Sequence, residues 1–388
     1  MPRLIESDLR TDLARLKSKQ LYRSPEIFSS KKPPKRLGRF VDFSSNDYLG
    51  LSQHPRVMAA ARRALSEWGT GSAASRLLSG NLNIHSRLEQ ALARFKRQKT
   101  ATVFSSGYLA NLGAIQTLVN EKDVVVLDRL CHASLIDGAR LSGAKLWVYR
   151  HRDASQLSEA LVKARSFRRR LVVTDAYFSM DGDVAPLPEL VRVCRDHQAM
   201  LMIDEAHSTG VYGRTGRGLL EHFGVTQGVD VVMGTLSKAL GSVGGFVSGS
   251  SALKGTLVNH CRAYIYTTAP SPAASASALE SLTLLEQTPE PLEKLWHNVR
   301  LLRRGLDLLE LDTLGSEGPI VPIRSGSSAQ TLRIKESLKA RGFFVSAIRP
   351  PSVRPGTARI RLSISADHSE EQISGLLAAL KTSRGLFR

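Results

Sequence analysis

The stretch GTLSKALGSVGGFV, residues 234–247, follows the apolar run at residues 231–233 and places a lysine where a buried strand is expected to end. Lysine is normally a solvated surface residue. Lys238 instead lies between an apolar run and a glycine-rich turn, flanked by Thr235 and Ser237. A lysine in such a place can pair with a carboxylate. It can also form a Schiff base, for which partial burial and cationic neighbours lower its pKa.

Short apolar runs recur before and after this stretch. Helical periodicity fills most of the intervals between them, for example at residues 187–197. Buried strands that alternate with helices predict an α/β architecture with a mostly parallel sheet. The runs are residues 103–104, 124–127, 146–149, 171–174, 200–203, 231–233 and 246–247.

The pattern changes after about residue 271. A long helical stretch at about 272–312 leads to apolar runs at 320–323, 343–348 and 359–365, which predicts a small α+β domain. An amphipathic helix at about 4–22 and a Lys/Pro-rich connector at 31–36 precede the large domain. The expected divisions are 1–45 for the N-terminal helix and connector, 46–271 for the large α/β domain, and 272–388 for the linking helix and small domain.

The chain is strongly basic, with 54 Lys and Arg against 35 Asp and Glu, a net charge of +19. Such a balance favours anionic partners. The basic clusters are short, they are not interleaved with aromatic residues, and no helix-turn-helix or zinc-knuckle pattern is visible. We therefore expect no nucleic acid partner, and two interpretations remain: solvated charged faces, or attraction of an anionic substrate.

The compartment is predicted from what the sequence lacks. No apolar run approaches the roughly 20 residues of a membrane span, and the N-terminus has no apolar signal-peptide core. Cys131, Cys194 and Cys261 lie far apart, which fits a reducing compartment and favours neither a disulfide framework nor a zinc site. We expect a cytoplasmic protein without a membrane partner.

The ends of the predicted strands carry the residues with chemical potential, because ligands of parallel α/β sheets bind beyond the carboxyl ends of the strands. Gly107 follows the run at 103–104 and opens a helix, which suits an anion. Asp204 ends the run at 200–203 and needs a partner if it is buried. That partner can be a metal shared with His207, although no second ligand cluster is visible, or a protonated ring nitrogen. An anion cradle, an aspartate and Lys238 are together the parts that bind pyridoxal phosphate (PLP).

Several longer segments carry a family resemblance. They are FSSNDYLGLSQHP (43–55), SSGYLAN (105–111), DRLCHASLIDGARLSGA (128–144), VVTDAYFSMDGDVAPL (172–187), MIDEAHSTGVYGRTGRG (202–218), GTLSKALGSVGGF (234–246) and SAIRPPSVRPGTARIRLSISADH (346–368). With them the chain resembles the α-oxoamine synthases, a branch of the fold-type-I PLP enzymes. The resemblance implies an aspartate-aminotransferase-like fold, with a mostly parallel seven-stranded sheet and a small C-terminal α+β domain. It also implies a homodimer with active sites at the subunit interface.

The resemblance implies roles around the PLP ring, carried over position by position. Lys238 forms the Schiff base and then acts as general base on the substrate's Cα proton. Asp204 binds the pyridine nitrogen, and His132 stacks on the ring face. His207 and Ser179 lie beside the phenolic oxygen.

It also implies contacts at the phosphate end of the cofactor. Gly107 and Tyr108 belong to this end, with Thr235 nearby. The segment RAYIYTTAPSP (262–272) resembles the one through which a neighbouring subunit completes the site. Thr267 and Thr268 would then be phosphate contacts from the other subunit.

Three residues are implied at the amino-acid substrate. Arg349 matches the arginine that grips the carboxylate, a task suited to its bidentate fork. Ser352 stands where the branch of the family that serves biotin biosynthesis often has threonine, and it keeps the hydroxyl. Arg23 matches an N-terminal substrate arginine. His85 is open to two interpretations, because it can face the site or begin a helix.

The implied reaction is a decarboxylative condensation of L-alanine with a pimeloyl thioester, carried on coenzyme A or an acyl carrier protein, as in the branch of the family that serves biotin biosynthesis. Both carriers are anionic, so the positive charge has a second possible use. Rival interpretations are a sister enzyme that uses glycine and acetyl-CoA, a fold-type-I aminotransferase, and a PLP-binding DNA regulator.

Overall fold

The computed structural model describes all residues except 1–3, 33–34 and 388. The chain divides into two compact units, which are described separately. Unit 1 comprises residues 1–45, 180–182 and 296–388, and unit 2 comprises residues 46–179 and 183–295.

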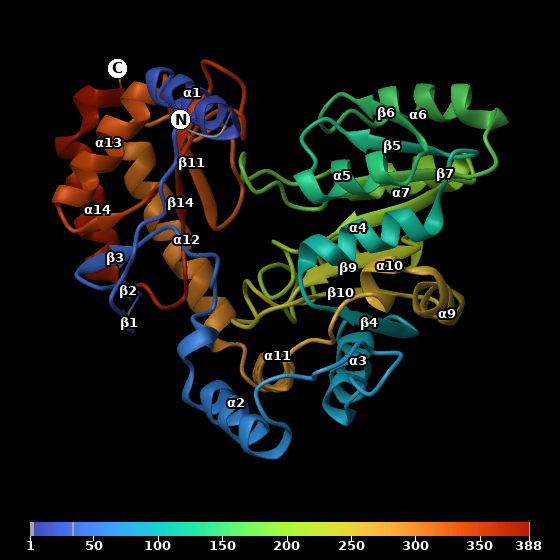
Figure 1. The fold of residues 1–388 in the computed structure, drawn as a ribbon. Helices are drawn as coiled ribbons and strands as arrows, with labels where there is room; N and C mark the ends of the chain where they lie inside the picture. The colour runs from blue at the N-terminus through green and yellow to red at the C-terminus, as the bar shows by residue number, and fades with distance from the viewer. Residues whose placement is uncertain (1–3, 33–34, 388) are drawn as a thin grey trace. The chain divides into compact units, whose positions relative to one another are not determined.

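Unit 2 is built around a sheet with strand order β4-β10-β9-β8-β7-β5-β6 (Figure 1). Neighbouring strands from β9 to β6 pair in parallel, and β10 pairs antiparallel with both β4 and β9. Within the described chain, this confirms the prediction of a mostly parallel seven-stranded sheet. The strands are β4 (Thr100–Phe104), β5 (Val124–Asp128), β6 (Lys145–Tyr149), β7 (Arg170–Asp175), β8 (Met200–Asp204), β9 (Val231–Thr235) and β10 (Gly245–Gly249).

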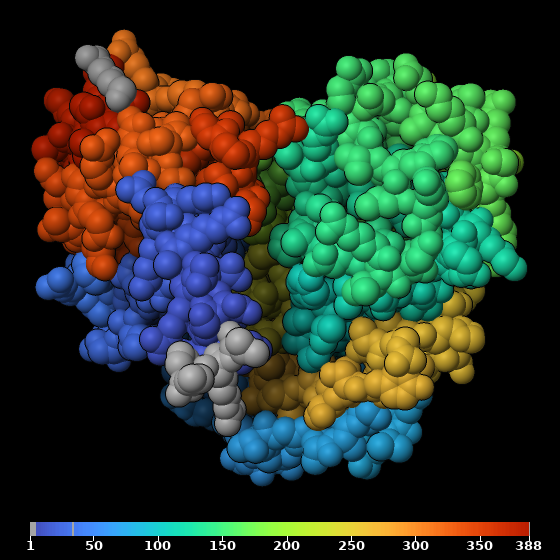
Figure 2. Space-filling model, turned by 45° about the horizontal axis from the view of Figure 1, so that its top comes forward, coloured from blue at the N-terminus to red at the C-terminus, as the bar shows by residue number. Residues whose placement is uncertain are grey.

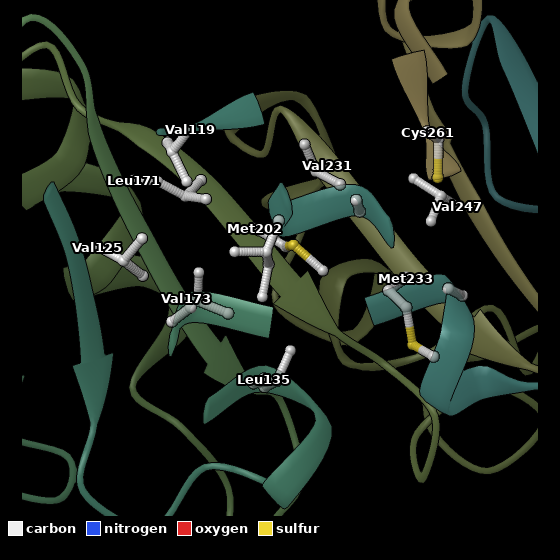
Figure 3. Packing of buried hydrophobic residues seen from close by; sticks show 14 of the residues in the cluster. Val119, Val125, Leu135, Leu171, Val173, Met202, Val231, Met233, Val247 and Cys261 are labelled. Atoms are coloured by element: carbon white, nitrogen blue, oxygen red, sulfur yellow. The ribbon is translucent and has the colours of Figure 1, made fainter. Parts of the chain in front are cut away.

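Helices cover the sheet, and apolar side chains fill the space between them. Figure 3 shows one such cluster, in which Val173, Met202 and Met233 from the strands lie near Leu135 of α5. Leu135 is fully buried, and a buried side chain of this size stabilises the fold by roughly 1.5–3 kcal/mol. The longer helices of unit 2 are α2 (Pro55–Trp68), α3 (Asn83–Phe95), α4 (Gly107–Leu118), α5 (Ala133–Leu141), α6 (Ala154–Lys163), α7 (Leu187–Asp196), α9 (Ser251–His260) and α11 (Pro272–Gln287).

The unit boundary differs from the expected domain boundary after residue 271. The helical stretch at 272–312 is two helices, α11 and α12 (Glu290–Leu308). α11 belongs to unit 2 because it packs against α2 and α3. Arg56 of α2 bonds Glu280 of α11 (2.7 Å). The division falls inside α12, between residues 295 and 296.

Unit 1 combines the N-terminal residues with the C-terminal part of the chain. Its sheet has the order β11-β14-β13, and a further sheet joins β1, β2 and β3 to β12. The N-terminal residues lie on the surface beside the C-terminal part (Figure 2), and Glu26 forms ion pairs with Lys335 and Lys339 (2.6 Å each). The elements are α1 (Leu4–Ser18), β1 (Lys31–Lys32), β2 (Arg36–Leu37), β3 (Phe40–Asp42), β11 (Ile320–Gly326), α13 (Ser328–Ala340), β12 (Phe343–Phe344), β13 (Ser346–Ile348), β14 (Ala358–Ser363) and α14 (Glu370–Thr382).

Helix α1 ends at Ser18, four residues before the expected end at 22, and the chain then turns through Gln20, whose φ is 56°. Among the residues described, no helix is both long and apolar enough to span a membrane.

Candidate active site

Two aspartates end adjacent strands at the carboxyl edge of the unit 2 sheet. Asp175 of β7 and Asp204 of β8 are direct register partners, and each side chain is buried. Burial raises the pKa of Asp175 well above its ordinary value, and the charge of Asp204 raises it further. Asp175 is therefore held toward the neutral form.

Asp204 is oriented by two hydrogen bonds. Asn111 Nδ2 donates to its Oδ2 (2.7 Å), and the backbone N–H of Ala206 donates to its Oδ1 (2.8 Å). Asn111 also donates to Ser134 Oγ (2.9 Å), so it connects α4 to the start of α5. Sequence reasoning missed Asn111. Its signals are its place at the end of the segment SSGYLAN (105–111) and its spacing of four residues after Gly107, which places both on the same face of α4.

His132 is the N-cap residue of α5. The backbone N–H of Ser134 donates to its Nδ1 (3.2 Å), which makes Nδ1 an acceptor and leaves the proton of the neutral ring on Nε2. Burial lowers the His132 pKa, while Asp204 raises it and Lys238 lowers it. Asp204 and Lys238 therefore both lie close enough to His132 to affect its charge, although the residue as a whole is exposed.

Lys238 is half-buried in the turn between β9 and β10. Its carbonyl accepts a hydrogen bond from Gly241 N (2.9 Å). Gly241 has φ 61°, and a Cβ there would lie 2.4 Å from the backbone N of Ser52, so both conformation and packing require glycine. The turn thus holds Lys238 at the same sheet edge as Asp175, whose pKa its charge lowers.

The N-terminus of α4 packs closely against β9 and β10. A Cβ on Gly107 would lie 3.3 Å from Thr235 Oγ1, and a Cβ on Gly245 would lie 2.5 Å from Gly107 Cα. The backbone N–H groups of this turn therefore lie near the Thr235 hydroxyl, an arrangement that suits an anion. Tyr108 is exposed, and its hydroxyl bonds Asp137, which raises the Tyr108 pKa.

His207 and Ser179 lie on two loops at the same edge. His207 Nδ1 is 2.7 Å from the hydroxyl of Tyr48, a fully buried residue of the FSSNDYLGLS segment. Ser179 is half-buried and follows the end of β7. Two residues before His207, Glu205 accepts a hydrogen bond from Lys96 Nζ at its Oε2 (2.5 Å), and the two form a buried ion pair that the sequence did not predict.

The three predicted substrate residues are all in unit 1. Arg23 Nη2 donates to Ser352 Oγ (3.1 Å). Arg349 donates to the carbonyl oxygens of Gln20 and Tyr22, and its buried Nε has no hydrogen-bond partner in the described structure. Burial lowers the pKa of Arg349, and the charge of Arg23 lowers it further. The structure therefore brings these three residues together.

The remaining predicted residues lie in the loop after α10 (Arg262–Ile265). Thr267 is half-buried, and Thr268 forms an isolated β-bridge with Ser75. His85 is buried and bonds the carbonyl of Pro270 (2.8 Å) while capping the start of α3. Of its two interpretations, the structure supports the start of a helix.

These groups fit PLP. A carboxylate can accept from a pyridinium N–H, an amine can form the imine, and a helix N-terminus with a hydroxyl beside it can bind a phosphate. No group of three or more His, Cys, Asp or Glu among the described residues is placed to hold a metal ion.

Sequence comparison places the chain in a family. A profile of the family "Aminotransferase class I and II" matches residues 39–380, and the chain belongs to this family. Within it, the chain groups with the 8-amino-7-oxononanoate synthases. The one from Methylococcus capsulatus is 48% identical over 377 residues, covering 96% of this chain and 97% of that protein. The one from Thioalkalivibrio sulfidiphilus is 45% identical over 380 residues, covering 97% of each.

Solved structures agree with this assignment. A serine palmitoyltransferase from S. paucimobilis, bound to a PLP–myriocin aldimine, has a TM-score of 0.93 at 33% identity and covers 99% of each chain. The 8-amino-7-oxononanoate synthase from Francisella tularensis has a TM-score of 0.77 at 30% identity, covering 89% of this chain and 97% of that one. The predicted aminotransferase-like fold and family are confirmed.

Proposed function

We propose that this chain is a PLP-dependent acyltransferase that condenses L-alanine with a pimeloyl thioester. The products are 8-amino-7-oxononanoate, CO₂ and a free thiol, so the reaction serves biotin biosynthesis. One observation carries the proposal: Asp204, Lys238 and the N-terminus of α4 converge at one sheet edge, in a chain that is 48% identical over 377 residues to a named 8-amino-7-oxononanoate synthase. We place the reaction in the cytoplasm.

Asp204 and Lys238 would supply the main chemical groups. PLP, when bound, withdraws electrons from the Cα of the amino acid. Asp204, fixed by Asn111 and Ala206, would hold the pyridine nitrogen protonated and so maintain this withdrawal. Lys238 would bind the cofactor covalently at rest, and its amine would remove the Cα proton as general base.

The surrounding residues would position the cofactor. The backbone of Gly107 and Tyr108 and the Thr235 hydroxyl would bind the phosphate, favoured by the helix dipole. The neutral His132 ring would stack on the pyridine, and His207 with Ser179 would lie at the phenolic oxygen.

We also propose that the active enzyme is a homodimer, in which Thr267 and Thr268 of one subunit reach the phosphate bound by the other. Tyr266, beside them, is 73% exposed. A large apolar residue so exposed supports a second subunit that covers this loop.

Arg349 would bind the substrate carboxylate, with Arg23 and Ser352 beside it. Its buried Nε has no protein partner among the described residues, and it lies close to a second guanidinium. An anion would satisfy that donor and offset the repulsion between the two positive groups.

Thiol release by the PLP-loaded protein tests the proposal. Pimeloyl-CoA with L-alanine is compared with acetyl-CoA and glycine, and pimeloyl-acyl carrier protein is offered with L-alanine in a third reaction. We expect release with a pimeloyl donor and alanine. Release only with acetyl-CoA and glycine would contradict the substrate assignment but keep the cofactor site. No release in any of the three reactions would contradict the proposed activity.

A further inference from the structure

A second charged cluster lies at the carboxyl edge of the unit 2 sheet, outside the groups assigned to PLP. His151 follows β6, with its Nδ1 2.9 Å from Asp128 Oδ1 and its Nε2 2.7 Å from Asp183 Oδ2. Asp128 is the last residue of β5, and Asp183 lies in the loop after β7. The His151 side chain is 22% exposed, and the two carboxylates are more deeply buried.

This geometry requires the charged form of the histidine. A neutral imidazole donates from one nitrogen only, whereas each ring nitrogen of His151 faces a carboxylate oxygen at hydrogen-bond distance. Burial alone would lower the His151 pKa, but the hydrogen bonds and charges of Asp128 and Asp183 outweigh it and raise the pKa to about 9. Arg152 supplies the other nearby charge, with its Nη1 3.4 Å from Asp183 Oδ2. One imidazolium and one guanidinium thus balance two carboxylates.

Asp128 anchors the loop that leads to His132. Its Oδ1 accepts from the backbone N–H of Leu130 (2.8 Å), and its carbonyl accepts from Cys131 N (3.2 Å). His132 is the next residue, and its own N–H donates to Asp175 (2.9 Å).

Asp183 anchors the loop that carries Ser179. Its carbonyl accepts from the backbone N–H of Phe178 (3.0 Å), which closes the loop. The Phe178 ring also packs edge-on against His151, with ring centroids 4.4 Å apart. Asp183 Oδ1 is buried and has no hydrogen-bond partner in the described structure, so this carboxylate depends on the cations at its other oxygen.

We propose that His151, as an imidazolium, is a positioning residue that ties the end of β5 to the loop after β7 and so fixes the backbone that presents His132 and Ser179 to PLP. The inference rests on the proposed function, because the roles of His132 and Ser179 belong to it. His151 itself contacts neither cofactor nor substrate in this scheme.

The test compares His151→Gln with His297→Gln. His297 also pairs with a carboxylate, Glu370 (2.8 Å), but that pair is exposed. Amide hydrogen exchange is measured at Leu130 and Phe178, and the PLP dissociation constant is measured by absorbance titration. We expect faster exchange at both amides and a dissociation constant raised roughly 2- to 30-fold in His151→Gln, with no change in His297→Gln.

Unchanged exchange, or faster exchange with unchanged PLP affinity, would overturn the inference while the proposed function stands. A wild type that does not bind PLP would overturn the proposed function as well. If His151→Gln does not fold, ¹⁵N-histidine NMR on the wild type decides. Two protonated ring nitrogens on His151 at pH 8 would support the proposed positioning role of the imidazolium, and a neutral ring at that pH would overturn it.

Discussion

Asp204 and Glu205 are consecutive acids with opposite surroundings. Glu205 is fully buried, and its carboxylate bonds Lys96 Nζ (2.5 Å), Ser208 Oγ (3.0 Å) and the backbone N–H of Leu220 (3.0 Å). Asp204 lies at the sheet edge beside Asp175, whose charged form it disfavours. Glu205 is paired with a cation inside the protein, whereas Asp204 is held by neutral donors. We infer that Glu205 stabilises the loop that follows β8 and that Asp204 is available to a cationic ligand group.

Lys238→Ala tests the proposed ligand site to which Asp204 belongs, and it gives the largest expected effect. Loss of the amine removes both the proposed covalent attachment and the proposed general base, so we expect thiol release to fall about 10⁴-fold. The side chain is only half-buried, so the free energy of unfolding should change by less than about 1 kcal/mol. Steady-state assays and urea unfolding check the two results, and more than trace activity would contradict the role of Lys238.

Lys96→Met tests the structural role that we infer for Glu205, the ion-pair partner of Lys96. It leaves Glu205 buried without its cation, which typically costs about 3–5 kcal/mol of stability. Urea unfolding of the apoprotein measures the loss. A variant as stable as the wild type would show that the ion pair does not stabilise the loop, and Lys254→Met, which removes a more exposed lysine from Glu89, is the matched control.

Asp204→Asn should separate the two acids most clearly. The shape is kept, but the charge that we propose to face the pyridine nitrogen is lost. We expect turnover to fall roughly 10²-fold with little change in the free energy of unfolding, the reverse of Lys96→Met. A large loss of stability with normal turnover would show that Asp204, like Glu205, stabilises the fold and does not serve the reaction.

The smallest expected effect concerns His368, a structural histidine of unit 1. It is fully buried against Phe43 (ring centroids 4.0 Å apart), and burial lowers its pKa from 6.5 to about 3. Below pH 6.5 the unfolded chain takes up a proton that the folded chain does not, so stability falls as the pH falls toward 3. Between pH 6.5 and 5, we expect wild type to lose roughly 1–2 kcal/mol more than His368→Gln. The free energy of unfolding is measured by urea unfolding at both pH values. An equal loss between pH 6.5 and 5 in wild type and His368→Gln would contradict this.

The sequence predicted the features of the fold that depend on local pattern. The buried strands, the parallel sheet and the placement of Asp204 and Lys238 at strand ends follow from apolar runs and from the rule that ligands bind at carboxyl edges. The division between residues 295 and 296 was not predicted, because α11 belongs to unit 2 through packing with α2 and α3.

The supporting contacts of the site could not be predicted in this way. Asn111 and Lys96 bond residues more than ninety positions away, and such pairs depend on how helices dock on the sheet. The resemblance of longer segments supplied the predicted roles of the nearby side chains, but it did not reveal which neighbours hold them.

Borohydride reduction of the PLP-loaded protein, followed by peptide mass spectrometry, tests the central claim most directly. The account predicts that PLP becomes fixed to Lys238 Nζ in the wild type and that Lys238→Ala gives no specific adduct. Reduction onto another lysine, or no adduct in a wild type saturated with PLP, would contradict the assignment of this sheet edge as the cofactor site.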